Sequence, residues 1–298
     1  MPTNRNASGQ AGASVSQNYL PQDYIIAQQF RQEMESYGIK FSGEIIPDGN
    51  IHRFYIEGHK RGTLNGAYTF HLDGCPAGWF MDHTRGISQT WRFRSGSKIS
   101  AYDPIKIAEA RQRREAERLQ AHEKSAEKAA YINQFAVPAI NHPYLTAKRI
   151  QSHGTLIYKD KLIVPIYNES DRLVNLQFIE ADGTKRFLSG GRKRGCFYTI
   201  GDLTHTVLIC EGFATGASLH EDTSQRVVIA FDAGNLLPVA RNIRELSPDS
   251  EIIICADNDI SGVGQAKATE AALSIGAKVL TPPTPGTDWN DVITGGVS

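Results

Sequence analysis

The chain has 298 residues, enough for two domains that each bury a substantial core. Lysine plus arginine and aspartate plus glutamate number 32 each, so the formal net charge is zero and any polyanion must bind to a local patch. The four cysteines form no CxxC pair, and no run reaches the ~18 apolar residues of a membrane span, so we expect a reduced, cytoplasmic protein without membrane contacts.

The N-terminal part begins with a polar segment and continues into a small aromatic-rich domain. Residues 1–20 are dominated by Ser, Asn, Gln, Gly and Ala, which is typical of a disordered tail. Apolar residues three or four positions apart predict an amphipathic helix over Asp23–Tyr37, ended by Gly38. Between residues 44 and 93, short aromatic segments alternate with glycine-containing turns, which predicts a small antiparallel sheet.

Two groups of residues in this sheet invite a functional interpretation. His71, Cys75 and His83 suggest zinc, but their spacing matches no common zinc pattern and a second cysteine is missing, so we expect no zinc. The tryptophans at positions 79 and 91, with arginines at 92 and 94 nearby, could stack on bases and contact phosphates. Core packing explains both tryptophans at least as well.

A long charged helix is predicted to follow. Asp103 and Pro104 are an N-cap and a first helical residue, and the helical pattern continues to Phe135. Charges of both signs dominate, so we expect a solvated connecting helix, with a nucleic-acid-binding arm as the alternative. We place the boundary between the domains here.

A basic segment lies downstream of this boundary. It follows two predicted strands, Lys161–Tyr167 and Arg172–Glu180. Between Lys185 and Arg194, five basic residues occur without an acidic one. Glycines at positions 190, 191 and 195 let the backbone approach a ligand closely. The five basic residues are Lys185, Arg186, Arg192, Lys193 and Arg194.

The last hundred residues alternate between apolar strands and helices, which predicts a parallel sheet covered on both faces. The expected strands are His205–Cys210, Arg226–Phe231, Glu251–Ala256 and Lys278–Leu280, and the expected helices are Phe213–Glu221, Asn235–Leu246 and Val263–Ile275.

Carboxylates follow two of these strands directly. Glu211 ends the first, and Asp257 and Asp259 follow the third, two residues apart, so their side chains point the same way on an extended backbone. The carboxyl ends of parallel strands share one edge, where ligands gather. Like charges held together favour a counter-ion, and oxygen ligands suit Mg²⁺ or Mn²⁺. Asp259 and Asp288 could instead cap helices.

Four motifs in this region, EGFATGASLH, VVIAFDAGNL, IIICADND and TDWND, resemble the Toprim half of DNA primases carried by plasmids and phages. The resemblance implies that Glu211, Asp257, Asp259 and Asp288 hold metal, with Glu211 organising a second ion or acting as general base. Asn290 stands where this family usually has a second acid, so the number of metal ions stays open.

The same resemblance gives the basic residues a role. In this family, basic residues that precede the Toprim fold hold template or nucleotide phosphates. Lys185 is the best match, Lys193 or Arg194 come next with their basic neighbours, and Arg149 resembles another basic residue of that core.

The implied activity is template-directed synthesis of short RNA primers on single-stranded DNA from ribonucleoside triphosphates. A non-catalytic single-strand-binding protein and a metal-dependent nuclease are the alternatives. No GxxxxGK[ST] motif occurs in the chain, so we expect any replicative helicase partner to be a separate protein.

The expected fold is α/β, with a C-terminal Toprim-like parallel sheet, a small basic α+β subdomain before it, and an N-terminal aromatic-rich α+β domain. The predicted segments are a tail (1–20), the N-terminal domain (21–102), the connecting helix (103–136), the basic subdomain (137–202) and the Toprim domain (203–298).

Overall fold

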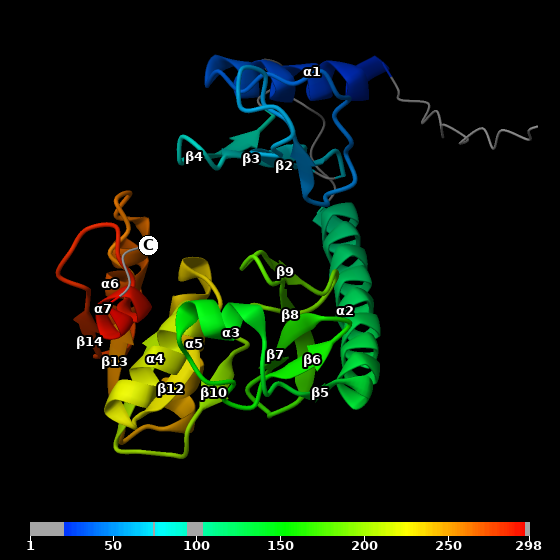
Figure 1. The fold of residues 1–298 in the computed structure, drawn as a ribbon. Coiled ribbons are helices and arrows are strands. Elements are labelled where there is room, and N and C mark those ends of the chain that lie inside the picture. The colour runs from blue at the N-terminus through cyan, green and yellow to red at the C-terminus, as the bar shows by residue number, and fades with distance from the viewer. Residues whose placement is uncertain (1–20, 74, 94–103, 296–298) are drawn as a thin grey trace, which may run out of the picture. The chain divides into compact units, whose positions relative to one another are not determined.

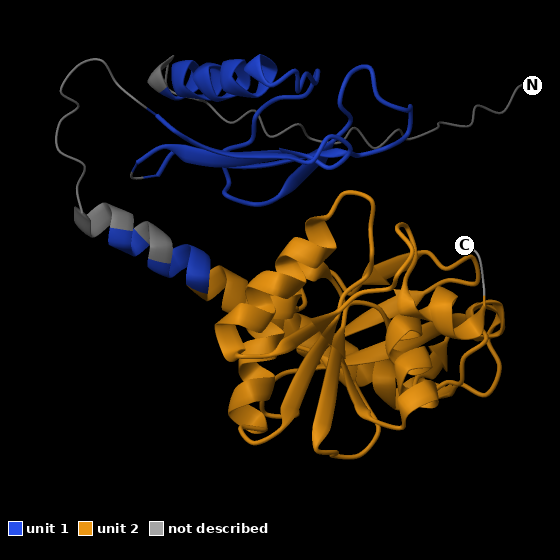
Figure 2. Ribbon diagram, turned by 90° about the vertical axis from the view of Figure 1, so that its left-hand side faces the viewer, with its two compact units in different colours: residues 1–115 blue, residues 116–298 orange. Residues whose placement is uncertain are grey.

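The computed structural model describes residues 21–73, 75–93 and 104–295. The chain divides into two compact units, residues 1–115 and 116–298 (Figure 2). The predicted tail, Arg94 and the Asp103 N-cap lie outside the described residues. In the described parts of the chain the helices are too short or too polar for any of them to span a membrane.

The first unit packs a helix on one face of a four-stranded antiparallel sheet; the helix and the antiparallel sheet were predicted, but the way they pack together was not. The helix is α1 (Pro21–Ser36) and the strands, in spatial order, are β1 (His52–Phe54), β2 (Gly66–His71), β3 (Ala77–Asp82) and β4 (Ile87–Arg92). Phe30 of α1 is fully buried and stacks on Phe70 with the ring centroids 4.8 Å apart. Gly78 permits this contact, since a Cβ there would lie 2.6 Å from the Phe30 ring.

The second unit begins with the long helix α2 (Pro104–Phe135), which enters it at residue 116, and an antiparallel sheet (Figure 1). Ala129 and Ile132 of α2 are buried against this sheet, so the prediction of a solvated helix is wrong for its C-terminal part. The reason is a narrow stripe of alanine and isoleucine within an otherwise charged sequence. The strands are β5 (Val137–Pro138), β6 (Leu156–Tyr158), β7 (Lys161–Tyr167), β8 (Leu173–Ile179) and β9 (Lys185–Phe187), with the short helix α3 (Pro143–Lys148) between β5 and β6.

A second five-stranded sheet completes this unit and confirms the predicted alternation. Its spatial order is β10 (Tyr198–Ile200), β12 (Arg226–Ile229), β11 (Thr206–Cys210), β13 (Glu251–Cys255) and β14 (Lys278–Leu280). The last four are parallel, whereas β10 is an antiparallel edge strand that the sequence did not predict.

Helices cover both faces of this sheet, which explains its continuous apolar strands. Along β11, Leu208 and Cys210 pack toward α4 (Phe213–Thr223), whereas Val207 and Ile209 pack toward α5 (Ala233–Leu246) and α6 (Val263–Ile275). The C-terminal helix α7 (Trp289–Thr294) lies with α4 (Figure 1). Buried residues of β7 and β8 belong to the same core cluster as α4, so the two sheets of this unit share a core.

Candidate active site

Acidic residues gather at the carboxyl edge of the parallel sheet. Cys210 of β11 lies opposite Cys255 of β13, so Glu211 and Asp257 leave adjacent strands at the same edge. Asp232 joins them from β12, where Phe231 adopts a left-handed conformation (φ 72°) that turns the chain out of the sheet. The sequence reasoning missed Asp232, although an acid directly after the apolar run VVIAF was the available signal.

The environment of Glu211 and Asp257 disfavours their charged forms. Burial, reinforced by the charge of Asp257, raises the pKa of Glu211 to about 7. Burial, reinforced by Asp288, raises the pKa of Asp257 to about 6. Glu211 Oε1 and Asp257 Oδ1 are buried without a hydrogen-bond partner. Two crowded carboxylates with unpartnered oxygens would be stabilised by a cation.

Asp259 has a different environment from Asp257. The Ser261 hydroxyl donates to it and holds its pKa below the usual value, and the backbone N–H of Gly264 donates at 2.8 Å. A Cβ at Gly264 would lie 2.6 Å from Asp259 Oδ2 and 3.2 Å from Glu211 Oε1. The bare glycine therefore lets these two carboxylates converge over the start of α6.

Asp288 fills the helix-capping role that the sequence left open. Its Oδ1 accepts from the backbone N–H of Asp291 at 2.9 Å, and Asp291 Oδ2 accepts from the backbone N–H of Asp288 at 3.1 Å. This reciprocal capping box begins α7. Asn290, buried behind it, donates to Lys148 O and Ser218 Oγ, so it ties α7 to α3 and α4.

The carboxylates do not form a closed metal cage. Among the residues that the structure describes, no three His, Cys, Asp or Glu side chains are grouped closely enough to hold an ion as they stand. The unpartnered oxygens of Glu211 and Asp257, with Asp259 beside Glu211, nevertheless offer the oxygen donors that a hard divalent cation prefers. The donor set therefore fits such an ion, after rotation of side chains.

Lys185 projects from β9 toward this acidic edge. Its ammonium nitrogen would lie 3.9 Å from a Cβ at Gly212 and is 5.8 Å from the centroid of the Tyr144 ring. Much of the side chain is exposed, but protein atoms crowd the ammonium itself, and this desolvation, with the charge of Lys148, lowers the pKa of Lys185. The charges of Asp257 and Asp288 oppose that effect. Side chains alternate along β9, so Arg186 points to the other side.

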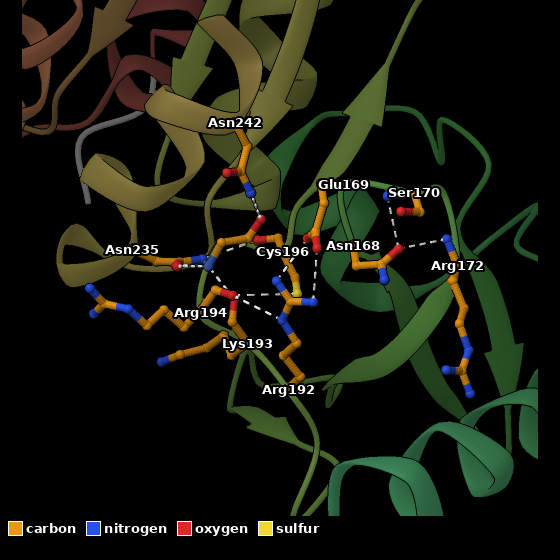
Figure 3. Close-up of polar contacts among 11 residues, drawn as sticks. Asn168, Glu169, Ser170, Arg172, Arg192, Lys193, Arg194, Cys196, Asn235 and Asn242 are labelled. Carbon is orange, nitrogen blue, oxygen red and sulfur yellow. Dashed lines mark hydrogen bonds and ion pairs between the residues drawn. The ribbon is translucent and has the colours of Figure 1, made fainter. Parts of the chain in front are cut away.

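The loop from Arg192 to Cys196 presents its basic residues unequally (Figure 3). Arg192 makes a bidentate ion pair with Glu169, at 3.2 and 2.7 Å. Lys193 pairs with Asp232 and lies over the Phe187 ring. Arg194 is exposed, and its side chain has no partner among the described residues. Lys193 therefore borders the acidic edge through its ion pair with Asp232, whereas the exposed Arg194 is available to bind a ligand.

Asn235 fixes this loop to the start of α5, and the sequence reasoning did not identify it (Figure 3). Its side-chain oxygen accepts from Gly195 N at 2.8 Å. Its amide nitrogen lies 3.1 Å from Lys193 O, 3.0 Å from Cys196 O and 2.8 Å from Ala230 O, so three carbonyls share two protons. The side chain is buried and every polar atom is used, which makes Asn235 a positioning residue for the loop.

Arg149 lies in a groove of about 360 Å³ beside α7, lined also by Lys148, Tyr144 and Asp291. Its guanidinium donates to Thr294 O at 2.9 Å, and its backbone is left-handed (φ 55°) at the end of α3. Arg149 therefore has a structural contact in addition to its exposed charge. Lys148, which the sequence reasoning did not select, adds a second basic residue to this groove.

The comparison with known families decides the nature of this fold. Residues 206–296, from β11 to the end of α7, match the family described as Toprim domain. This part of the chain is a Toprim domain. The prediction made from the four motifs is thereby confirmed, and the acidic edge described above is the edge of this Toprim domain.

Curated relatives extend the similarity beyond the Toprim domain. One DNA primase TraC from Escherichia coli is 34% identical over 260 residues, which are 80% of this chain and 24% of the relative. A second DNA primase TraC from Escherichia coli is 34% identical over 281 residues, 86% of this chain and 19% of the relative. The chain thus spans about a quarter or less of the length of these relatives.

Solved primase structures show partial fold similarity. The DnaG primase catalytic domain bound to single-stranded DNA has a TM-score of 0.44 at 12% identity, with 60% of this chain and 76% of that chain covered. The primase fragment of the bacteriophage T7 primase-helicase protein has a TM-score of 0.42 at 13% identity, with 75% and 90% covered. Toprim primases generally use a divalent metal ion, which agrees with the donor set of the acidic edge.

Proposed function

We propose that this chain is a DNA primase of a mobile element, which makes short RNA primers on single-stranded DNA during replication or transfer. The observation that carries the proposal is the pair of carboxylates Glu211 and Asp257, each with one buried, unpartnered oxygen, together with Lys185, whose ammonium interacts with the charge of Asp257. This combination suits a cation and a triphosphate on one edge of the Toprim domain. The similarity to DNA primase TraC supports it.

In this proposal, Glu211, Asp257 and Asp259 hold Mg²⁺ or Mn²⁺, and Asp288 contributes its charge from the start of α7. The bound ion would neutralise triphosphate charge and lower the pKa of the attacking hydroxyl. In the alternative in which Asp257 and Asp259 hold the ion without Glu211, Glu211 would act as the general base toward the primer 3′-hydroxyl.

Lys185 and the loop residues Lys193 and Arg194 would bind phosphates of the incoming ribonucleoside triphosphate. Lys193 would exchange its ion pair with Asp232 for a phosphate, which leaves the Asp232 carboxylate close to Glu211 for the metal. Arg149 and Lys148 would contact the backbone of the template strand in their groove beside α7.

Purified protein, single-stranded DNA, labelled ribonucleotides and Mg²⁺ test this proposal together. Short RNA products that require both template and metal are expected, and chelation with EDTA should abolish them. Degradation of the DNA without synthesis would favour the nuclease alternative. Binding without either reaction would favour the single-strand-binding alternative. A separate helicase is expected to be unnecessary for synthesis on a bare single strand.

A further inference from the structure

In the described part of the first unit, α1 covers one face of the sheet and leaves the opposite face open. Phe70, Phe80 and Trp91 point to the covered face and pack around Phe30 of α1. Side chains alternate along a strand, so Trp79, next to Phe80, points to the opposite face. The register places Trp79 between Thr69 of β2 and Thr90 of β4.

The two tryptophans of this sheet therefore have different roles. The Trp91 ring lies 5.4 Å from that of Phe30 and 6.0 Å from that of Phe70, so it belongs to the core. Trp79 packs against none of these core rings, and its indole N–H donates to Ser88 Oγ at 2.9 Å. This contact fixes the indole at the middle of the open face between short, hydroxyl-bearing side chains.

The open face carries positive charge around this indole. Its ten strand positions include Arg53 on β1 and Arg92 on β4, both exposed, and none of them is a carboxylate. His71 on the same face is already paired with Asp73 at 2.9 Å, and the Arg53 guanidinium lies 3.1 Å from His83 Nε2 and would leave that contact for a phosphate. The two arginines stand on opposite edge strands, with Trp79 in the row between them.

We propose that this face binds single-stranded DNA, with one base stacked on Trp79 and backbone phosphates at Arg53 and Arg92. An aromatic side chain beside cations on an open surface suits a splayed strand, because each base offers a π-face and each linkage a negative charge. Trp79, Met81 and Ala77 are the partly exposed apolar side chains of this face, whereas Ala67 is buried. This site needs neither metal nor the Toprim domain.

Equilibrium binding of fluorescein-labelled oligothymidylate to the full chain in EDTA tests the proposal. Trp79→Ala should weaken binding about 5- to 150-fold, the measured range for loss of one stacked base. Trp79→Phe should retain most of the affinity while losing most of the quenching of protein fluorescence by DNA. Arg53→Ala with Arg92→Ala should lower the salt slope by about 1.4, for two single-strand phosphate contacts.

Tyr24→Ala is the matched control, because Tyr24 is an exposed aromatic residue of α1 in the same unit. It should bind DNA as the parent protein does. Circular dichroism and melting temperature of each variant establish folding before binding is compared. Unchanged affinity, salt slope and quenching in folded Trp79 and arginine variants would overturn the proposal. Absence of primer synthesis by the parent, with this binding intact, would reject only the proposed function.

Discussion

Replacement of Glu211 by glutamine should stabilise the metal-free protein at neutral and alkaline pH. In the folded protein Glu211 has a pKa of about 7, compared with an ordinary value of 4.5. The folded state therefore binds the proton more tightly than the unfolded state. At pH values below 4.5 the group has no cost, whereas the free energy of unfolding falls as pH rises from 4.5 through 7.

The magnitude follows from the same two values. At 1.36 kcal/mol for each pKa unit, the difference corresponds to about 3 kcal/mol, fully expressed above pH 7. Glutamine removes this charge and keeps the shape of the side chain. Glu211→Gln should thus be more stable than the parent in EDTA at pH 8, and nearly equal to it at pH 5.

Hydrogen exchange of peptides from β11 and β13 measures the difference in stability between the parent and Glu211→Gln, because protection in these strands reports opening of the second unit by itself. Parent and variant are compared at the same pH, so intrinsic exchange rates cancel. Glu251→Gln is the matched control: Glu251 begins β13 at the other end of the sheet, and its pKa is held below the usual value by Lys278. A Glu211→Gln variant less stable than the parent at pH 8 would show that the charged Glu211 side chain does not destabilise the folded protein.

The remaining predictions concern the residues around the acidic edge. The double variant Lys193→Ala with Arg194→Ala should weaken binding of single strands or nucleotides. The salt slope of single-strand binding should fall by about 0.7 for every phosphate that the variant no longer binds. An unchanged slope would show that the loop contacts no phosphate. Asn235→Ala leaves buried carbonyls unpaired, which should lower the free energy of unfolding by about 1–3 kcal/mol. The variant should also show the binding defect of the Lys193/Arg194 variant. Normal binding by a folded Asn235→Ala variant would contradict the positioning role of Asn235. Gly264→Ala should displace Asp259 and Glu211 and reduce Mg²⁺ binding measured by calorimetry, and normal affinity would show that these carboxylates do not meet there.

The sequence predicted correctly those helices and strands whose own apolar residues indicate which faces are buried. Strands such as Glu251–Cys255 are apolar on both faces because helices cover both, so their type and their shared carboxyl edge were readable. The edge position of Glu211 and Asp257 followed from that alternation. The capping role of Asp288 was also readable as an alternative, since aspartate is a preferred N-cap.

Other features depend on contacts between distant segments. β9 and β10 have three residues each, and their pairing with β8 and β12 decides their structure, so the sequence around them reads as a loop. Asn235 matters because the chain 40 residues earlier folds onto it. Trp79 and Trp91 could not be distinguished without the register between strands, which places them on opposite faces of one sheet.

The most direct test of the metal-site account is primer synthesis by Asp257→Asn. This change keeps the shape and removes one charge, and Asp257 Oδ1 has no hydrogen-bond partner to lose. Synthesis should fall by more than about 100-fold, a barrier increase of about 3 kcal/mol, with folding and single-strand binding retained. Asp249→Asn, an exposed aspartate before β13 at the other end of the sheet, should synthesise primers at the parental rate. If the parent makes primers and Asp257→Asn makes them equally fast, Asp257 does not hold the catalytic metal and the account of the acidic edge is wrong.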